Sequence, residues 1–440
     1  MSADAGVKKG FMSWYFQSNL LIRILIGLVL GAVVGIALGA ADPALAKGFS
    51  NNARFFGDLF IRLLKMIMVP VVFFSLVGGA ASIAPSHLGR VGVKILAFYL
   101  ITSAVAVLIG LILANFIQPG LNFNVAGDPA AQVTVRTAPS LGAVILAIIP
   151  TNPVESLAKG DVLPIIFFSI CFGVAISLVK DATNAKTAQA AEVLFETFTA
   201  AADTMYKIVA GVMQYAPVGV FVLIAIVFAE QGSKAIGPLL LVTLTVYIGL
   251  TIHLVVCYGG CLGVFGLGLG AFLRKATQPM ITAFVTRSSS GTLPITLRAT
   301  EERMGAPRSI ASFSLPLGAT INMDGTAIYL GVCAMFIGYA TNAPLTLAQQ
   351  AIVVVTATLA SIGTAGVPGA GAIMLLMVME SIGMEVQAGT AIAAAYAMIL
   401  GIDALLDMGR TSLNVTGDMV GTVIIAKQEK TLDQAVWDAK

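Results

Sequence analysis

A cluster of charged residues inside one long hydrophobic stretch most limits how this chain can fold. Between about Ala391 and Ile425 the sequence is mainly apolar, yet it contains three aspartates and an arginine. At about 100° per residue, a helix projects six polar side chains within an arc of about 100°: Asp403, Asp407, Arg410, Thr411, Asn414 and Asp418. An ionised side chain facing lipid costs about 2.5–3.5 kcal/mol or more at the bilayer centre. This polar stripe must therefore face protein or a watery cavity, where such residues mark an ion or substrate path.

The composition is typical of a polytopic helical membrane protein. Hydrophobic residues make up 58% and charged residues 11% of the sequence, with a mean hydropathy of +0.94. Soluble domains average about 45–50% apolar and about 25% charged residues. The net charge of +3 is spread without a basic block, which argues against nucleic-acid binding. The cysteines all lie in apolar runs, where we interpret them as small core residues: Cys171, Cys257, Cys261 and Cys333.

Six apolar segments long enough to span a membrane precede the irregular half of the chain. They lie near residues 15–40, 59–84, 93–117, 141–179, 193–229 and 236–265. The first imitates a signal peptide, but its length and Arg23 favour an uncleaved transmembrane helix.

Lysines and arginines are distributed unequally between the two sides of these spans. With a cytoplasmic N-terminus and re-entrant later segments, the cytoplasmic ends carry Lys8, Lys9, Arg90, Lys94, Lys180, Lys186, Arg274, Lys275, Arg298, Arg303, Arg308, Lys427 and Lys430. The opposite side carries Lys47, Arg54, Arg136 and Lys234. The positive-inside rule therefore predicts an inner (plasma) membrane protein with both termini in the cytoplasm.

The third span places Tyr99, Thr102 and Ser103 on one helical face. Back-bonding to helix carbonyls explains such hydroxyls equally well, unless another oxygen cluster lies opposite them. His253 stands alone in an apolar helix, where a satisfied core histidine is the simpler interpretation than a metal ligand.

After residue 271 the apolar segments are broken by polar, glycine-rich sequences. Arg287-Ser-Ser-Ser-Gly-Thr-Leu-Pro294 interrupts one, and Ser361-Ile-Gly-Thr-Ala-Gly-Val-Pro-Gly369 interrupts another. Irregular backbone at membrane depth survives only where protein or a cavity satisfies it, so each break predicts the tip of a re-entrant hairpin. Paired breaks in two halves are typical of a transporter binding site.

A third break, Asn322-Met-Asp-Gly-Thr326, lies between the hairpins. Its side-chain oxygens and freed carbonyls suit a hard cation such as Na⁺, although a plain helix kink is the alternative.

Four motifs together carry a resemblance to a known family. They are Ser-Ser-Ser-Gly-Thr-Leu-Pro at 288–294, Asn-Met-Asp-Gly-Thr at 322–326, Gly-Thr-Ala-Gly-Val-Pro-Gly at 363–369, and the polar stripe. The chain resembles the glutamate transporter family of dicarboxylate/amino acid:cation symporters from about Arg62 almost to Lys427. Arg287 at the first hairpin tip resembles the prokaryotic sodium/aspartate-glutamate symporter branch.

The resemblance implies eight transmembrane helices plus two re-entrant hairpins, arranged as inverted repeats in a homotrimer. Residues 12–92 and 141–230 would form a trimerisation scaffold. A moving transport domain would comprise 93–117 and 236–427, including hairpins at about 270–300 and 345–380, with 428–440 as a cytoplasmic tail. Substrate and ions would bind within this transport domain and cross the membrane with it, by an elevator-type alternating-access mechanism.

By motif position, the resemblance also implies the binding residues. Arg410 would pair the side-chain carboxylate of an acidic amino acid, and Asp407 its amino group. The pocket would be completed by Thr326, Thr411, Asn414, Ser289, Ser290, Gly366 and Val367, supported by Arg287 and Asp403. One cation would bind Asp418 and carbonyls of Gly318, Asn322 and Asn414, and another Tyr99, Thr102, Ser103, Asn322 and Asp324. A third would use carbonyls near Met323 and Ser361.

The charges of this core predict cation-coupled, electrogenic uptake without an organic cofactor. Four aspartates and two arginines leave two net negative charges: Asp324, Asp403, Asp407 and Asp418 against Arg287 and Arg410. A bound acidic amino acid adds a third net negative charge. Moving the loaded site across the membrane without net charge therefore requires roughly three monovalent cations, with Na⁺ favoured.

Other functions fit the residues less well. Within the transporter class, proton coupling or a C4-dicarboxylate substrate remains open. An ion channel is the nearest different class, but a carboxylate clamp suits a bound organic anion better than ion flow. An intramembrane aspartyl protease would need Asp403 and Asp407 to share a proton, which an arginine three residues later opposes. We therefore expect a transporter and no enzyme.

Overall fold

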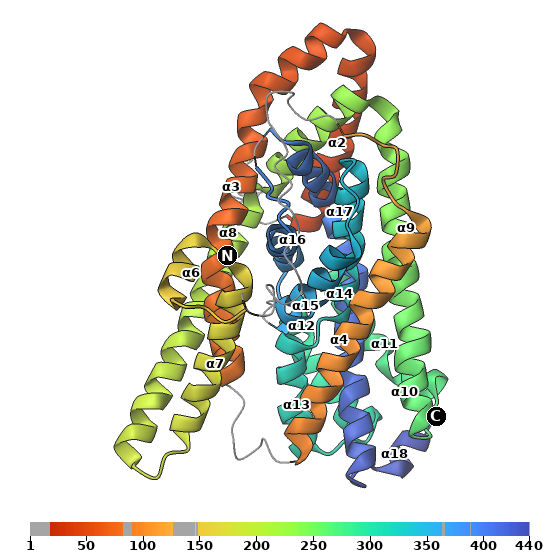
Figure 1. Cartoon of the computed structure of the whole chain (residues 1–440). Coiled ribbons are helices and arrows are strands. Elements are labelled where there is room, and N and C mark those ends of the chain that lie inside the picture. Colours follow the sequence, from red (N-terminus) through yellow and green to blue (C-terminus); the bar gives the residue numbers. More distant parts are fainter. Residues whose placement is uncertain are drawn as a thin grey trace, which may run out of the picture.

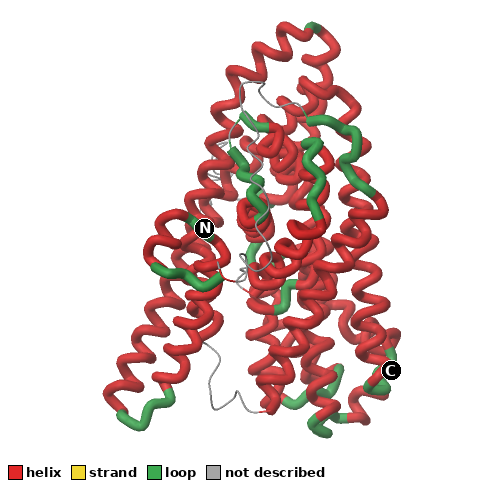
Figure 2. The backbone as a smooth tube through the Cα atoms, viewed as in Figure 1, coloured by secondary structure: helices red, strands yellow, loops and turns green. Residues whose placement is uncertain are grey.

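The computed structural model describes residues 18–81, 90–125, 146, 148–362, 366–387 and 389–439. Every regular element within these ranges is helical, which confirms the predicted all-α class (Figure 2). The predicted N-terminal tail, Arg136 and Gly363 lie outside the described residues. Within the described ranges, six helical stretches are long and apolar enough to cross a membrane: Leu20–Ala41, Pro43–Ala81, Val91–Ile117, Ala185–Val264, Arg308–Ala340 and Ala391–Gln428. The fourth of these covers the fifth and sixth predicted spans.

One group of helices contains α2 (Leu20–Ala41), α3 (Pro43–Ala81), α7 (Val162–Lys180) and α8 (Ala185–Gln231), with the short α6 (Pro153–Lys159) beside α7. Helix α8 packs along both α2 and α3, and α7 packs against α3 (Figure 1). Asn19 and Asn184 accept hydrogen bonds from the first turns of α2 and α8 and fix where these helices begin.

A row of glycines brings α2 into backbone contact with α8. A Cβ atom at Gly27 would lie 2.5 Å from the carbonyl oxygen of Pro217, and one at Gly31 would lie 2.5 Å from that of Phe221. Glycines at such spacing let two apolar helices approach closely, and helix association within a bilayer depends on this packing. The contact therefore stabilises α2 and α8 as one unit.

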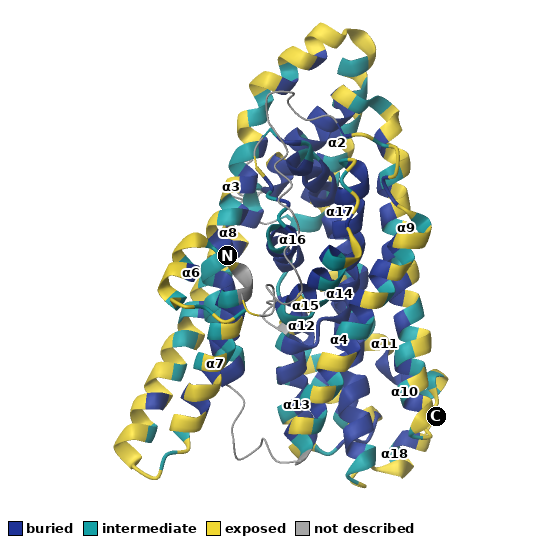
Figure 3. Ribbon diagram, viewed as in Figure 1, coloured by how far each residue is buried: buried dark blue, intermediate teal, exposed yellow. Residues whose placement is uncertain are grey.

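A second group surrounds the polar stripe. It contains α4 (Arg90–Ile117), α9 (Ile236–Ile252), the π-helical turn η2 (His253–Tyr258), α10 (Gly259–Val264), α14 (Asp324–Ala340) and α17 (Ala391–Gln428). Every residue of α14 is buried, because α4, α9, α15, α16 and α17 all pack around it. Figure 3 shows the buried surfaces of α14 and α17 at the centre of this group.

The three predicted breaks separate pairs of shorter helices. Helices α11 (Leu269–Thr286) and α12 (Ser289–Arg298) form the first hairpin, and α15 (Leu347–Ile362) and α16 (Ala370–Ser381) form the second. Helix α13 (Arg308–Ile321) ends where α14 begins, with Asn322 and Met323 in the break. Figure 2 shows these interruptions as loops inside the bundle.

The remaining elements join or follow these helices. They are the 3₁₀ turn η1 (Gly232–Ala235), the π-helical turn η3 (Ala299–Arg303) and α18 (Gln434–Asp438). In α18 the Trp437 side chain is buried, and Lys275 of the first hairpin donates hydrogen bonds to the carbonyls of Val436 and Ala439. The chain end is therefore attached to the base of the first hairpin.

Two helices extend well beyond the predicted apolar segments. Helix α3 begins at Pro43 rather than near residue 59, and α8 begins at Ala185 rather than near residue 193. Their N-terminal extensions contain polar residues such as Asn51, Asn52 and Lys186, so a search for apolar segments does not detect these parts of the helices.

Candidate functional site

The polar stripe lies on the buried face of α17. Each of its six predicted members is at most 6% exposed: Asp403, Asp407, Arg410, Thr411, Asn414 and Asp418. Leu405 and Met408 on the same helix remain partly exposed. Leu406, Val415 and Met419, which point away from the stripe, are buried as well, so α17 is enclosed by protein on most sides.

Arg410 is held by two carboxylates of its own helix. Its Nη1 donates to Oδ1 of Asp403 at 2.9 Å, and its Nε donates to Oδ1 of Asp407 at 3.0 Å. The guanidinium also lies over the Tyr329 ring of α14, 4.2 Å from the ring centroid. Because charge pairing and ring contact both favour the cation, this buried guanidinium stays charged and oriented.

Thr411 and the second hairpin complete the surroundings of Asp407. The Thr411 hydroxyl donates to Oδ1 of Asp407 at 3.1 Å, and the Gly369 amide donates to Oδ2 at 3.4 Å. A Cβ atom at Gly371 would lie 2.6 Å from Cζ of Arg410. The backbone of the second hairpin thus approaches the guanidinium closely because residue 371 has no side chain.

These groups line a narrow cavity that both hairpins and α14 help to close. Ten of its lining residues were predicted to bind or support the substrate or an ion: Arg287, Ser289, Met323, Thr326, Gly366, Val367, Asp407, Arg410, Thr411 and Asn414. Ala370 and Gly371 also line it. A cavity lined by both a guanidinium and a carboxylate can bind opposite ends of a small zwitterion.

The two hairpin tips touch beside this cavity. The Ser288 hydroxyl donates to the Gly366 carbonyl at 2.7 Å, and the Ser290 amide lies 3.4 Å from the same oxygen. A Cβ atom at Gly366 would lie 2.6 Å from Oγ of Ser290. Contact between the tips closes one side of the cavity.

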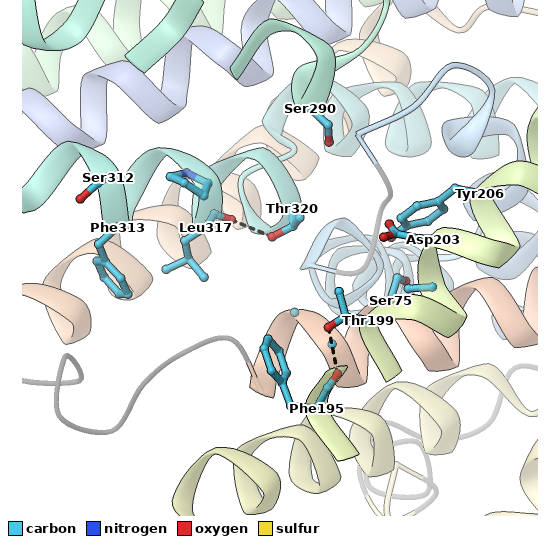
Figure 4. A pocket seen from close by; sticks show the side chains of 14 residues that line it. Ser75, Phe195, Thr199, Asp203, Tyr206, Ser290, Ser312, Phe313, Leu317 and Thr320 are labelled. Carbon is cyan, nitrogen blue, oxygen red and sulfur yellow. Dashed lines mark hydrogen bonds between the residues drawn. The ribbon is translucent and has the colours of Figure 1, made fainter. Parts of the chain in front are cut away.

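Ser290 itself lies outside the cavity around Arg410. It faces a larger pocket of about 410 Å³ between α3 and α8 on one side and α13 on the other (Figure 4). Asp203 and Tyr206 of α8 line this pocket opposite Thr320 of α13. Ser289 is therefore the first-hairpin serine that lines the smaller cavity, and Ser290 lies at the boundary between the two helix groups.

Arg287 ends α11 with a left-handed backbone, at φ 54°, and its side chain is buried. Its Nε atom has no hydrogen-bond partner among the described residues. This second guanidinium lines the cavity with Arg410, as predicted, and adds positive charge close to Asp407.

Asn322 and Asp418 form an oxygen cluster below the cavity. Nδ2 of Asn322 donates to Oδ1 of Asp418 at 3.0 Å and to the Asn414 carbonyl at 3.1 Å. Within the described ranges, its buried Oδ1 has no hydrogen-bond partner. A Cβ atom at Gly318 would lie 2.5 Å from Oδ1 of Asp418 and 2.7 Å from the Tyr99 hydroxyl. An unpartnered oxygen among these groups fits a bound cation.

Asp324 forms a second oxygen cluster at the start of α14. Ser103 of α4 donates to its Oδ1 at 2.6 Å, and Tyr258 of η2 donates to its Oδ2 at 2.7 Å. Nε2 of His253 lies 3.0 Å from the same Oδ2. Ser103 and Asp324 are therefore brought together as predicted, so one of the three third-span hydroxyls donates to an opposing carboxylate.

The other predicted ion ligands make hydrogen bonds within their own helix or to a neighbouring helix. Tyr99 donates to the Ser314 carbonyl at 3.1 Å, while Thr102 donates to the Tyr99 carbonyl within its own helix at 3.2 Å. Ser361 likewise donates to the Thr358 carbonyl at 2.7 Å. Met323 accepts a hydrogen bond at its sulfur from Asn414, 3.0 Å away.

The sequence did not indicate three of these contacts. Tyr258 and Tyr329 were not singled out, and His253 was interpreted as a satisfied core histidine without its partner, Asp324, being identified. Among the described residues, no three His, Cys, Asp or Glu side chains form a group that could hold a metal ion. The candidate cation sites instead consist mainly of hydroxyl, amide and backbone oxygens around single carboxylates, which suit a monovalent cation.

Comparisons with known proteins agree with this arrangement. The chain is 36% identical to the "Proton/glutamate-aspartate symporter" of Escherichia coli (strain K12), over 86% of this chain and 85% of the relative. It is 32% identical to the "Proton/sodium-glutamate symport protein" of Geobacillus stearothermophilus, over 85% and 87%. It is 33% identical to the "C4-dicarboxylate transport protein" of Azorhizobium caulinodans, over 86% and 83%.

A family model described as "Sodium:dicarboxylate symporter family" matches residues 20–428, which include both hairpins and the polar stripe. These relatives are membrane transporters, and the chain is accordingly a transporter and no enzyme. This chain belongs to the sodium:dicarboxylate symporter family.

Proposed function

We propose that this protein is a secondary active symporter that takes up L-aspartate or L-glutamate together with Na⁺. The observation that carries the proposal is the Arg410–Asp407 pair inside a cavity closed by two hairpins. The guanidinium binds the distal carboxylate of the substrate, and Asp407 binds its ammonium group. An ammonium-free dicarboxylate gives Asp407 no positive partner, so the cavity favours amino acids over succinate.

Sodium is the proposed coupling ion because both oxygen clusters offer hard ligands around one carboxylate. Asp418 with Asn322 forms one, and Asp324 with Ser103 forms the other. Three Na⁺ per substrate would balance the net charge of the core, and the third would use carbonyls near Met323 and Ser361. The names of the relatives include proton-coupled and sodium-coupled transport, so proton coupling is the alternative within this function.

We further propose that the two helix groups are the scaffold and the transport domain of an elevator. The pocket between α8 and α13 lies at their boundary, and Lys65 of α3 pairs there with Glu380 of α16 at 3.7 Å. Small contacts of this kind can break when one group slides past the other. The exposed apolar side chains of α2 would face lipid or neighbouring subunits of a homotrimer, and the mass of the solubilised protein tests that assembly.

We also propose an orientation of the chain in the inner (plasma) membrane. The α7–α8 turn, the beginning of α13 and the end of α17 lie toward one end of the molecule (Figure 1). Lys180, Arg308 and Lys427 belong to these segments. This end is proposed to be cytoplasmic, in agreement with the positive-inside rule.

Uptake into proteoliposomes tests the coupling ion. Labelled aspartate is offered under an inward gradient of Na⁺, of H⁺ or of K⁺, with the other two ions equal on both sides. An inward Na⁺ gradient should drive accumulation, and the K⁺ gradient should not. Accumulation driven by the H⁺ gradient alone, with equal uptake in choline and sodium media, would replace the sodium proposal by proton coupling.

A further inference from the structure

The π-helical turn η2 directs two side chains at one oxygen of Asp324. In an α-helix, residues five apart differ by roughly 140° in direction, so His253 and Tyr258 could not reach the same atom. In a π-helix the hydrogen bonds run from residue i to i+5, and such residues lie nearly above one another. The two rings are 4.6 Å apart in an edge-to-face arrangement, and both are 0% exposed.

The contacts divide the Asp324 carboxylate into two unlike oxygens. Oδ2 accepts hydrogen bonds from the Tyr258 hydroxyl at 2.7 Å and from His253 Nε2 at 3.0 Å. A carboxylate only accepts hydrogen bonds, so this ring nitrogen carries the hydrogen. Oδ1 has a different partner, the Ser103 hydroxyl at 2.6 Å. The Ser103 hydroxyl keeps lone pairs that it can offer to a cation beside Oδ1, whereas the protonated Nε2 of His253 on the Oδ2 side can only donate.

We propose that His253 and Tyr258 are positioning residues that anchor Oδ2 of Asp324, so that Oδ1 and Ser103 present their oxygens to a bound Na⁺. This inference rests on the proposed sodium coupling. The structure provides space for the anchor at Gly417, where a Cβ atom would overlap the Tyr258 hydroxyl. Groups that orient a metal ligand in this way change metal affinity by about 10–100-fold when they are removed.

Sodium binding can be measured without transport. Purified protein is heated in detergent without substrate, and the rise in unfolding temperature is followed as Na⁺ replaces choline at constant ionic strength. Tyr258→Phe and His253→Ala should each raise the half-saturating Na⁺ concentration about tenfold. His253→Gln, which keeps a donor, should restore it toward the unmutated value.

The matched control is Tyr396→Phe, because the Tyr396 hydroxyl is equally buried and donates to the Ala372 carbonyl at 2.9 Å. Its loss should lower the unfolding temperature without changing the half-saturating Na⁺ concentration. The Asp418 cluster also contributes to the titration, so Tyr258→Phe is repeated in an Asp324→Asn background. There it should produce no further change, because its effect passes through the Asp324 carboxylate.

Three results would overturn the inference. An unchanged half-saturation in both Tyr258→Phe and His253→Ala would do so while leaving sodium coupling intact. An equal effect of Tyr258→Phe with and without Asp324 would mean that the tyrosine acts elsewhere. If Na⁺ does not stabilise the unmutated protein at all, the sodium proposal and this inference fail together.

Discussion

Nε of Arg410 donates a 3.0 Å hydrogen bond to Oδ1 of Asp407, one turn earlier on α17. Each side chain therefore gives the other a buried partner of opposite charge, and a zwitterion can replace both halves of this interaction at once. Asp403 holds the far side of the guanidinium at 2.9 Å, so Arg410 keeps one carboxylate while it binds another.

Replacement of Arg410 should change the class of substrate. In Arg410→Cys, aspartate uptake should fall by about thirtyfold or more, because breaking a buried charge pair costs about 2–5 kcal/mol. Binding of neutral amino acids should persist or increase. The control is Arg298→Cys, which removes an exposed arginine that pairs with Glu302 in the next turn. Unaltered aspartate uptake by Arg410→Cys would contradict the proposal that Arg410 binds the distal carboxylate of the substrate.

Replacement of Asp407 should have the complementary effect. Asp407→Ser removes the proposed ammonium partner but keeps a small polar group beside Thr411. Uptake of aspartate should be lost, whereas uptake of succinate should be retained or increase. The measurement is the ratio of the two initial rates in the same vesicles. An equal loss for both substrates would indicate a structural role for Asp407 instead.

Neutralising the two cation carboxylates should weaken the response to sodium. Asp418→Asn and Asp324→Asn should each raise the Na⁺ concentration that gives half-maximal aspartate uptake, because each removes a buried negative charge next to a proposed ion. Asp181→Asn, in the exposed turn after α7, is the control. The idea fails if both buried variants keep the Na⁺ dependence of the control.

Close approach of the second hairpin to Arg410 depends on Gly371. Gly371→Ala would place a Cβ atom 2.6 Å from Cζ, so the guanidinium or the hairpin must move. The aspartate concentration for half-maximal uptake should rise about tenfold, a cost of about 1.4 kcal/mol. Gly260→Ala, at a helical position with nothing within 4 Å, should leave it unchanged. Equal behaviour of the two variants would mean that the observed contact is unimportant for binding.

The second hairpin should be the moving gate on the extracellular side, because Gly366, Gly369 and Gly371 permit backbone changes that a Cβ atom would resist. In a background without the native cysteines, spin labels at Pro368→Cys and Val285→Cys should change separation when substrate is added to the Na⁺-bound protein. A control pair at Val264 and Val285 should not change, since the first hairpin is expected to stay still. An invariant distance for the first pair would count against this gate.

The polar stripe and the three breaks could be predicted because both depend on local sequence. Helical periodicity alone aligned Asp403, Arg410 and Asp418, and ionised groups in an apolar segment required a buried face. Glycine, proline and asparagine then indicated where helices end. These features fixed the location of the candidate site without knowledge of how the helices pack.

Other parts of the site depend on packing that no local pattern contains. The Tyr329 ring meets Arg410 only because α14 and α17 cross at that level. His253 and Tyr258 converge because the six residues from His253 to Tyr258 adopt a π-helical turn. Regular α-helical geometry over the same segment would point their side chains in different directions. Ser289 and Ser290 are adjacent in sequence, yet the structure directs them to different pockets.

Substrate preference tests the central claim most directly. Initial uptake of labelled aspartate and labelled succinate is measured for the unmutated protein in identical proteoliposomes, at fixed pH, in sodium and in choline medium. Aspartate should exceed succinate by tens-fold or more in sodium, and its uptake should collapse in choline, because only an amino acid satisfies both Arg410 and Asp407. Equal uptake of succinate and aspartate would mean that Asp407 does not bind the ammonium group of the substrate. The assignment of acidic amino acids as substrates would then be wrong.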